Sequence, residues 1–270
     1  MRHLLAAFFL AVVLAACGAP TPYSDTNIVG GQEVADPSLY NTVAFTIPDL
    51  ATKRQSYCTG TLVGERTVLT AAHCVVDADN KPLWVNKFAF VCRGLNVKEA
   101  YENDNCVPVS EFDWNRGFSL ARALNREPGP AHDIAIAHLE GPLTGHRTNL
   151  GLDRNLSVSE EVRLVGYGLT YGGQWNRHKD QGTGVLRTVL SYIVNLDNEK
   201  LRVDVENRAA STIKGACSGD SGGPVYVQGE DGLVQVGVLS IGNTDRTGRC
   251  MGWSSYTDIR YYKDWILERL

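Results

Sequence analysis

The stretch GACSGDSGGP, residues 215–224, places Ser221 between an aspartate and a pair of glycines. Glycines let the backbone adopt positive φ and leave no side chain in the path of an incoming carbonyl group. The amides of Gly219 and Ser221 can then converge on one developing oxyanion, as acyl transfer requires. Taken alone, a turn rich in glycine and serine is usually only a loop, so this interpretation needs support elsewhere in the chain.

A serine nucleophile needs a general base, and the base needs an acceptor that orients it. The stretch TAAHC (70–74) supplies His73, and HDIAIAHL (132–139) supplies Asp133 at the head of an apolar run. Four further histidines are interpreted as surface or half-buried residues without a catalytic role: His132, His138, His146 and His178.

Short runs rich in Val, Ile, Thr and aromatic residues recur along the chain, separated by Gly, Asn, Asp and Pro. This pattern predicts an antiparallel barrel or sandwich rather than alternating strands and helices. Only YYKDWILERL at the end predicts a helix, and the polar stretch 141–155 is interpreted as a connection between two barrels. The predicted strands are 42–47, 60–72, 88–92, 133–139, 161–168, 185–194, 201–205 and 233–242.

The composition suits one large all-β domain or two fused small ones, since the chain has 270 residues of which 43% are hydrophobic. The formal charge is −4, and no run of Lys and Arg is present. Nucleic acid is therefore not an expected partner, because phosphate binding needs a basic face.

The first seventeen residues, MRHLLAAFFLAVVLAAC, predict an export signal. Arg2 precedes an apolar run, 4–16, that is too short to span a bilayer core of roughly 30 Å as a helix. The final LAAC resembles the bacterial lipobox, which implies that Cys17 is lipidated and anchors the chain to a membrane. The alternative is a plain signal peptide cut near Ala16, with Cys17 incidental.

Without Cys17, six cysteines remain, an even number that predicts three disulfides in an exported chain. Six cysteines allow about fifteen pairings, so their number alone leaves the connectivity open. No CxxC pair occurs, so no metal site is expected.

The stretch TNIVGG, residues 26–31, has two local interpretations. It is either an edge strand running into a turn, or a cut site at which Ile28 becomes a new N-terminus. Nothing in its immediate surroundings decides between the two.

Four stretches in register resemble the trypsin-like (chymotrypsin-fold) serine proteases: IVGG (28–31), TAAHC (70–74), DIAIAHL (133–139) and GDSGGP (219–224). The order His, Asp, Ser is also that of this family. The resemblance covers residues 28–270 and implies an all-β fold of two antiparallel six-stranded barrels with the active site between them. With the leader, the expected parts are a signal peptide (1–16), a propeptide (17–27), a first barrel (about 28–145), a second barrel (about 150–256) and a C-terminal helix (about 259–270).

The resemblance implies a role for each residue of the site. Ser221 is the nucleophile, His73 the general base, and Asp133 the group that holds the His73 tautomer. The amides of Gly219 and Ser221 form the oxyanion hole. Ser240 matches the family serine that supports the buried aspartate.

It also implies activation by a cut before Ile28, whose freed amine pairs with the buried Asp220. Asn27 stands where many relatives carry Arg or Lys, so the activating protease is expected not to be tryptic. Because Cys17 is the only tether within 17–27, we hypothesise that one cut after Asn27 both activates the enzyme and releases it from the membrane.

The family frame implies the disulfides Cys58–Cys74 and Cys217–Cys250, which leaves Cys92–Cys106 as the third pair. The pocket for the residue before the scissile bond, S1, has no charge at Gly215, where tryptic relatives carry aspartate. A P1 Arg or Lys is therefore disfavoured, and an apolar P1 residue, from Leu and Met to Phe and Tyr, is expected. Asp245 lies in a loop that could enter the site. The residues assigned to S1 are Gly215, Ala216, Ser240, Gly242 and Ser254.

The sequence thus predicts a secreted serine endopeptidase that acts on proteins or peptides as a monomer, without cofactor or metal. It is expected at the bacterial cell envelope as a precursor and outside the membrane once released. The first alternative is a catalytically silent binding or adhesion protein of the same fold. A second is an esterase or narrow processing enzyme with the same triad.

Overall fold

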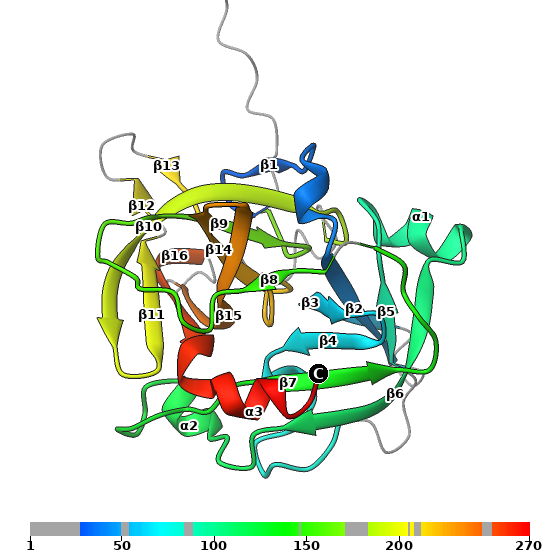
Figure 1. The fold of residues 1–270 in the computed structure, drawn as a ribbon, viewed down its shortest axis with the longest axis horizontal. Coiled ribbons are helices and arrows are strands. Elements are labelled where there is room, and N and C mark those ends of the chain that lie inside the picture. Colours follow the sequence, from blue (N-terminus) through cyan, green and yellow to red (C-terminus); the bar gives the residue numbers. More distant parts are fainter. Residues whose placement is uncertain are drawn as a thin grey trace, which may run out of the picture.

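Two antiparallel β-barrels lie side by side in the computed structural model (Figure 1). The structure describes residues 28–49, 54–83, 89–145, 147–170, 183–204, 206–207, 212–244 and 250–270. The expected signal peptide and propeptide, His146, His178 and Asp245 lie outside these ranges. No helix in the described ranges is long and apolar enough to cross a membrane.

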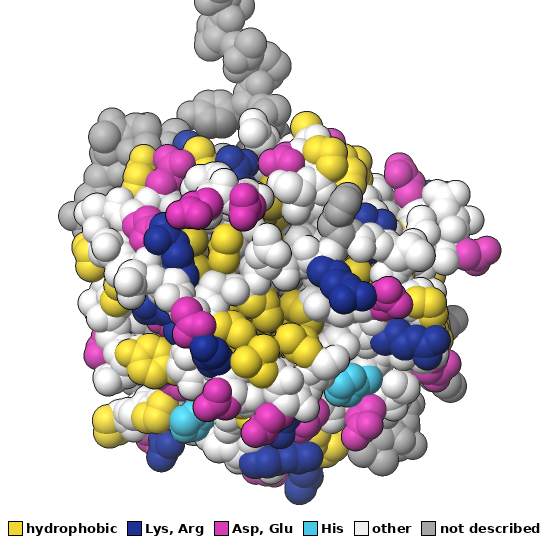
Figure 2. Space-filling model, viewed as in Figure 1, with side chains coloured by type: hydrophobic (Ala, Val, Ile, Leu, Met, Phe, Trp, Pro, Cys, Tyr) yellow, Lys and Arg dark blue, Asp and Glu magenta, His cyan; other side chains and the backbone are white. Residues whose placement is uncertain are grey.

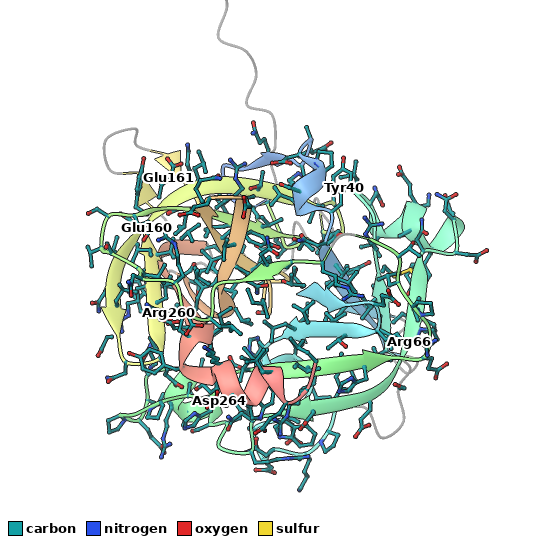
Figure 3. All side chains as sticks on the ribbon, in the orientation of Figure 1. Tyr40, Arg66, Glu160, Glu161, Arg260 and Asp264 are labelled. Atoms are coloured by element: carbon teal, nitrogen blue, oxygen red, sulfur yellow. A yellow bond between two sulfur atoms is a disulfide. The ribbon has the colours of Figure 1, made fainter. Side chains whose placement is uncertain are left out.

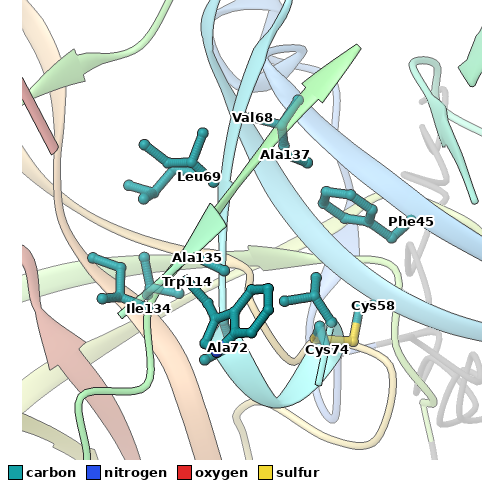
Figure 4. Packing of buried hydrophobic residues seen from close by; sticks show 14 of the residues in the cluster. Phe45, Cys58, Val68, Leu69, Ala72, Cys74, Trp114, Ile134, Ala135 and Ala137 are labelled. Atoms are coloured by element: carbon teal, nitrogen blue, oxygen red, sulfur yellow. A yellow bond between two sulfur atoms is a disulfide. The ribbon is translucent and has the colours of Figure 1, made fainter. Parts of the chain in front are cut away.

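The first barrel closes in the order β2-β3-β4-β7-β6-β5. Its interior is apolar because side chains of each strand alternate between core and solvent, and Phe45, Leu69 and Trp114 pack there (Figure 4). A short helix lies on each side of β6 in the chain. The elements are β2 (Thr42–Asp49), β3 (Arg54–Gly64), β4 (Thr67–Thr70), β5 (Phe90–Cys92), α1 (Val97–Glu102), β6 (Cys106–Trp114), α2 (Leu120–Ala123) and β7 (Ala135–Leu139).

The second barrel runs β10-β11-β16-β15-β14-β9, and pairing of β9 with β10 closes it. β1 (Gln32–Glu33) adds to β10, β8 (Asn149–Leu150) pairs in parallel with β15, and β12 (Glu206–Asn207) pairs with β13 (Thr212–Ile213). The barrel strands are β9 (Glu161–Gly166), β10 (Arg187–Asp197), β11 (Lys200–Asp204), β14 (Pro224–Gly229), β15 (Gly232–Thr244) and β16 (Cys250–Asp258).

The C-terminal segment leaves the second barrel and packs on the first. It is a 3-10 turn, η3 (Ile259–Tyr262), followed by a short helix, α3 (Lys263–Leu267), so the regular helix is shorter than expected. Ile259, Tyr262 and Ile266 are buried in the core cluster of the first barrel. Arg260, labelled in Figure 3, donates to the carboxylate of Asp258 and to the carbonyl of Arg154 in the inter-barrel connection. The segment therefore fastens the two barrels together.

The face shown in Figure 2 carries interspersed positive and negative side chains, and apolar side chains gather near its middle. Three disulfides stabilise the fold, joining Cys58 to Cys74, Cys92 to Cys106 and Cys217 to Cys250. These are the pairs that the family resemblance and the remaining cysteines lead one to expect. Three disulfides are typical of proteins that fold in an oxidising, extracellular environment.

Candidate active site

His73 and Asp133 meet at one end of the first barrel. His73 lies on the 3-10 turn η2 (Ala72–Cys74) that follows β4, and Asp133 lies just before β7. Oδ2 of Asp133 is 2.8 Å from Nδ1 of His73, and Oδ1 accepts the His73 backbone amide at 2.9 Å. Ser240 on β15 adds a third bond, donating its hydroxyl to Oδ2 at 2.6 Å. The Asp133 side chain is fully buried. Its bonds to His73 fix which edge of the imidazole ring faces the cleft.

Burial and charge shift the pKa values of Asp133 and His73 in opposite directions. Burial alone raises the pKa of Asp133, but the charge and hydrogen bond of His73, with the bond from Ser240, outweigh it, so this pKa lies below its ordinary value. Burial likewise lowers the pKa of His73, and the attraction and hydrogen bond of Asp133 outweigh it, so the pKa of His73 lies above its ordinary value. The arrangement therefore favours a protonated imidazole paired with a carboxylate.

Contacts from the second barrel hold the segment that carries Asp133. Glu199, which is buried, accepts the backbone amides of Ala131 and His132. Nδ1 of His132 is 2.9 Å from the hydroxyl of Tyr262 in η3. His132 thus helps fix this loop. These two contacts could not be predicted from the sequence, because Glu199 and Tyr262 are each at least 67 residues from their partners and belong to no catalytic motif.

The Ser221 turn needs its glycines. Gly219 has a φ of +99°, and a Cβ there would lie 2.8 Å from Cα of Gly168. Gly222 has a φ of +80°, and a Cβ there would lie 2.1 Å from Oγ1 of Thr70. Any other residue would combine an unfavourable backbone conformation with a steric clash.

The first barrel pins this turn. The amide of Thr59 on β3 donates to the Ser221 carbonyl at 2.7 Å, and its hydroxyl donates to the Gly219 carbonyl at 2.9 Å. Among the described residues, the amides of Gly219 and Ser221 donate to no acceptor. Since neither amide has an acceptor in the part of the chain that the structure describes, the two leave a place where an oxyanion can be stabilised.

Ser221 and His73 line the same cavity, whose volume is about 220 Å³. No hydrogen bond joins the Ser221 hydroxyl to His73 among the described residues; such contacts often tighten only when substrate binds. The cavity continues past Ala216, Gly242 and the Cys217–Cys250 disulfide.

Asp220, next to the serine, points away from the cavity into the interior. Oδ1 accepts the amide of Gly168 at 2.7 Å and Oδ2 accepts the amide of Cys217 at 2.8 Å. Burial raises the pKa of Asp220 to about 7, against the smaller lowering effects of the two amides and of Arg187. Gly166 and Gly168 leave room for the carboxylate, since a Cβ at Gly166 would lie 2.1 Å from Oδ1.

Ile28 occupies the core of the second barrel, with its side chain 1% exposed. Its φ of +42° is unfavourable for a β-branched residue. Val29 forms a bridge to Gly215, whose amide donates to the Val29 carbonyl at 2.9 Å. The start of the described chain therefore lies against the segment that leads to Ser221.

The residues assigned to S1 lie around this same segment. Ala216 is buried beside Gly215, while Gly242 on β15 is the register partner of Ser254 on β16. None of these residues carries a charge. One cluster in the described residues, Cys58, His73 and Cys74, has the composition of a metal site, but its two sulfurs are bonded to each other and are not available as thiolate ligands.

The buried carboxylate of Asp133 lies behind His73, and His73 shares a cavity with Ser221, whose turn carries the amides of Gly219 and Ser221. This arrangement between two β-barrels defines a serine hydrolase. The family profile described as Trypsin matches residues 28–266. The chain is 29% identical to chymotrypsin-C of Rattus norvegicus, covering 97% of both chains. It is 25% identical to a trypsin of Phaedon cochleariae, covering 96% of both, and 26% identical to serine protease 7 of Drosophila melanogaster, covering 94% of this chain and 67% of the relative.

The chain belongs to the trypsin family. It is a serine-type endopeptidase, a hydrolase whose substrates are proteins or peptides.

Proposed function

We propose that this chain is an exported precursor, converted by a cut between Asn27 and Ile28 into an endopeptidase that cleaves after uncharged residues. Ser221 attacks the substrate carbonyl while Nε2 of His73 takes the hydroxyl proton. Asp133 keeps the proton of His73 on Nδ1 and stabilises the imidazolium. The amides of Gly219 and Ser221 bind the oxyanion of the tetrahedral intermediate.

The leaving amine then takes the proton from His73, and an acyl-enzyme on Ser221 remains. A water molecule, deprotonated by His73, attacks this ester, and the Ser221 oxygen recovers the proton as the acid product leaves. One observation carries the proposal: Asp133 is fully buried, bonded twice to His73 and once to Ser240. A carboxylate buried with this set of donors is suited to orienting a catalytic imidazole.

Labelling with a fluorophosphonate probe tests the catalytic assignment. The chain beginning at Ile28 should be labelled once and should hydrolyse peptides, and Ser221→Ala should abolish both. A folded, secreted chain that takes no label would favour the alternative of a silent binding protein. Labelling with hydrolysis of esters but no peptide would favour an esterase.

The cut supplies a partner for Asp220. With the Asn27–Ile28 bond intact, the Ile28 nitrogen carries no charge, and burial raises the pKa of Asp220 to about 7. A freed α-amine would pair with this carboxylate and also relieve the unfavourable φ of Ile28. Peptide hydrolysis should rise as intact mass shows the loss of residues 1–27; hydrolysis at full rate before that loss would contradict this step.

Specificity follows from the uncharged pocket. With no carboxylate at Gly215 or Ala216, a P1 guanidinium or ammonium would be buried without a partner. The proposal is an uncharged P1 residue, for which the family resemblance suggests apolar side chains from Leu and Met to Phe and Tyr. Digestion of a peptide library should give cleavage after uncharged residues, and cleavage after Arg or Lys would refute the assignment.

The leader determines where the enzyme acts. We propose that Cys17 is lipidated and holds the precursor at a cell envelope, and that the cut after Asn27 releases the active chain. Active enzyme that is still joined to Cys17 would contradict release.

A further inference from the structure

A small polar space lies beside Gly242, which lines the substrate cavity together with Ala216. Gly242 and Ser254 are register partners on β15 and β16, so their side-chain directions share one face of the sheet. A Cβ placed on Gly242 would lie 3.9 Å from Oγ of Ser254 and 3.7 Å from the carbonyl oxygen of Ala216. The hydroxyl and the carbonyl therefore border the space that Gly242 leaves open.

Both polar groups lack a partner in the described residues. The Ser254 side chain is buried with a relative exposure of 0%, and its hydroxyl makes no hydrogen bond there. Ala216 lies outside the strands, and no backbone hydrogen bond among the described residues uses its carbonyl oxygen. A buried polar group without a hydrogen bond costs free energy. A ligand that bonds to both groups should therefore bind more tightly than one that bonds to neither.

The chemistry of the two groups selects the ligand. A hydroxyl can donate or accept, whereas a carbonyl can only accept. A carboxamide satisfies both: its oxygen accepts from Ser254, and its NH₂ group donates to Ala216. A carboxylate would repel the carbonyl, a guanidinium would have no counter-charge, and an aliphatic side chain would leave both groups unpaired. Asparagine combines this amide with nearly the size and shape of leucine.

We infer that the S1 pocket prefers a P1 carboxamide, asparagine above all, and that one copy of this chain cuts the Asn27–Ile28 bond of another. The inference rests on the proposed function and names the activating protease. In the described fold, Val29 pairs with Gly215 behind the pocket of its own molecule. The bond to be cut is therefore presented by a second copy, and activation accelerates as active enzyme accumulates.

The test needs active enzyme whose activating cut was made by a different protease. An Asn27→Lys precursor, cut by limited trypsin treatment, yields a chain that begins at Ile28 and is otherwise unchanged. Its substrate is the precursor carrying Ser221→Ala, which cannot process itself. Intact mass should show conversion to a chain that begins at Ile28, at a rate proportional to added enzyme. Asn27→Asp in the substrate should slow the cut at least tenfold.

A matched pair of enzyme variants tests the hydroxyl. In Ser254→Ala the rate of cutting Asn27 substrate, relative to an Asn27→Leu substrate, should fall about tenfold. In Ser255→Ala this ratio should stay as in the unsubstituted enzyme, because Ser255 is the register partner of Ile241 and its side chain has the opposite direction from that of Ser254. An unchanged ratio in Ser254→Ala would overturn the inference.

The remaining outcomes separate this inference from the proposed function. Enzyme that cuts the Asn27→Leu substrate but not the Asn27 substrate would overturn the inference and leave the protease assignment standing. Enzyme that is labelled by fluorophosphonate yet cuts neither precursor would also overturn the inference. Enzyme that takes no label and cuts nothing would overturn the proposed function itself.

Discussion

At the scale of single residues, Asp133 is the group on which the catalytic geometry most depends. Its carboxylate fixes which nitrogen of His73 carries a proton, and it does so from a fully buried position. Asp133→Asn keeps the volume but removes the charge and permits the wrong tautomer. We expect kcat to fall by about four orders of magnitude with the fold retained. Kinetics with circular dichroism as control would check this, and a loss below tenfold would refute it.

The pH dependence of the reaction follows from His73. Its pKa is raised above its ordinary value of 6.5, because the charge and hydrogen bond of Asp133 outweigh burial. The general base must be neutral, so kcat/KM should decline toward acid from a midpoint above pH 6.5. Asp133→Asn should move this midpoint to lower pH. A pH–rate profile whose acid midpoint is the same in both enzymes would contradict the account.

Asp220 makes the stability of the uncut chain depend on pH. Its pKa, about 7 in the fold, lies above the ordinary 3.8, so the folded chain binds a proton that the unfolded chain releases. The free energy of unfolding should therefore fall as pH rises from about 4 to about 7, by up to roughly 4 kcal/mol. Urea titrations of the Ser221→Ala precursor should show this slope. Asp220→Asn, or the cut at Ile28, should reduce it; an equal slope in all three would contradict the assignment.

At the scale of elements, strands with a clear apolar pattern were predictable and several others were not. The runs 42–47 and 133–139 correspond to β2 and β7. Three barrel strands were missed: β6, β14 and β16. β6 contains a proline and two acidic residues, β14 directly follows the Ser221 motif, and β16 contains two adjacent serines. Each is held by its neighbours in a closed barrel, a tertiary effect that overrides weak local propensity.

Two of the disulfides should have similar effects on stability but different effects on substrate binding. Cys92 and Cys106 are register partners on β5 and β6, away from the cleft, whereas Cys217 and Cys250 line the substrate cavity. Replacing either pair by alanine should cost roughly 3 kcal/mol of stability. Only loss of Cys217–Cys250 should also raise KM, because it loosens the pocket wall. Urea unfolding with steady-state kinetics would check this; equal effects on KM would refute it.

At the scale of the whole molecule, the site exists only where the two barrels meet. His73 and Asp133 come from the first barrel, and Ser221 and Ser240 come from the second. Motifs could name these four residues, because the family keeps them in short recognisable stretches. They could not name Glu199, Tyr262 or Thr59, whose contacts join distant parts of the chain. Nor could they show that the Ser254 hydroxyl lies unpaired beside Gly242.

The most direct test of the account is fluorophosphonate labelling, read by intact mass, of the precursor and of the chain that begins at Ile28. We expect one label on Ser221 in the cut chain, much slower labelling of the precursor, and none in either form of Ser221→Ala. Equal labelling of both forms would contradict activation by the cut. A folded cut chain that takes no label would contradict the catalytic assignment as a whole.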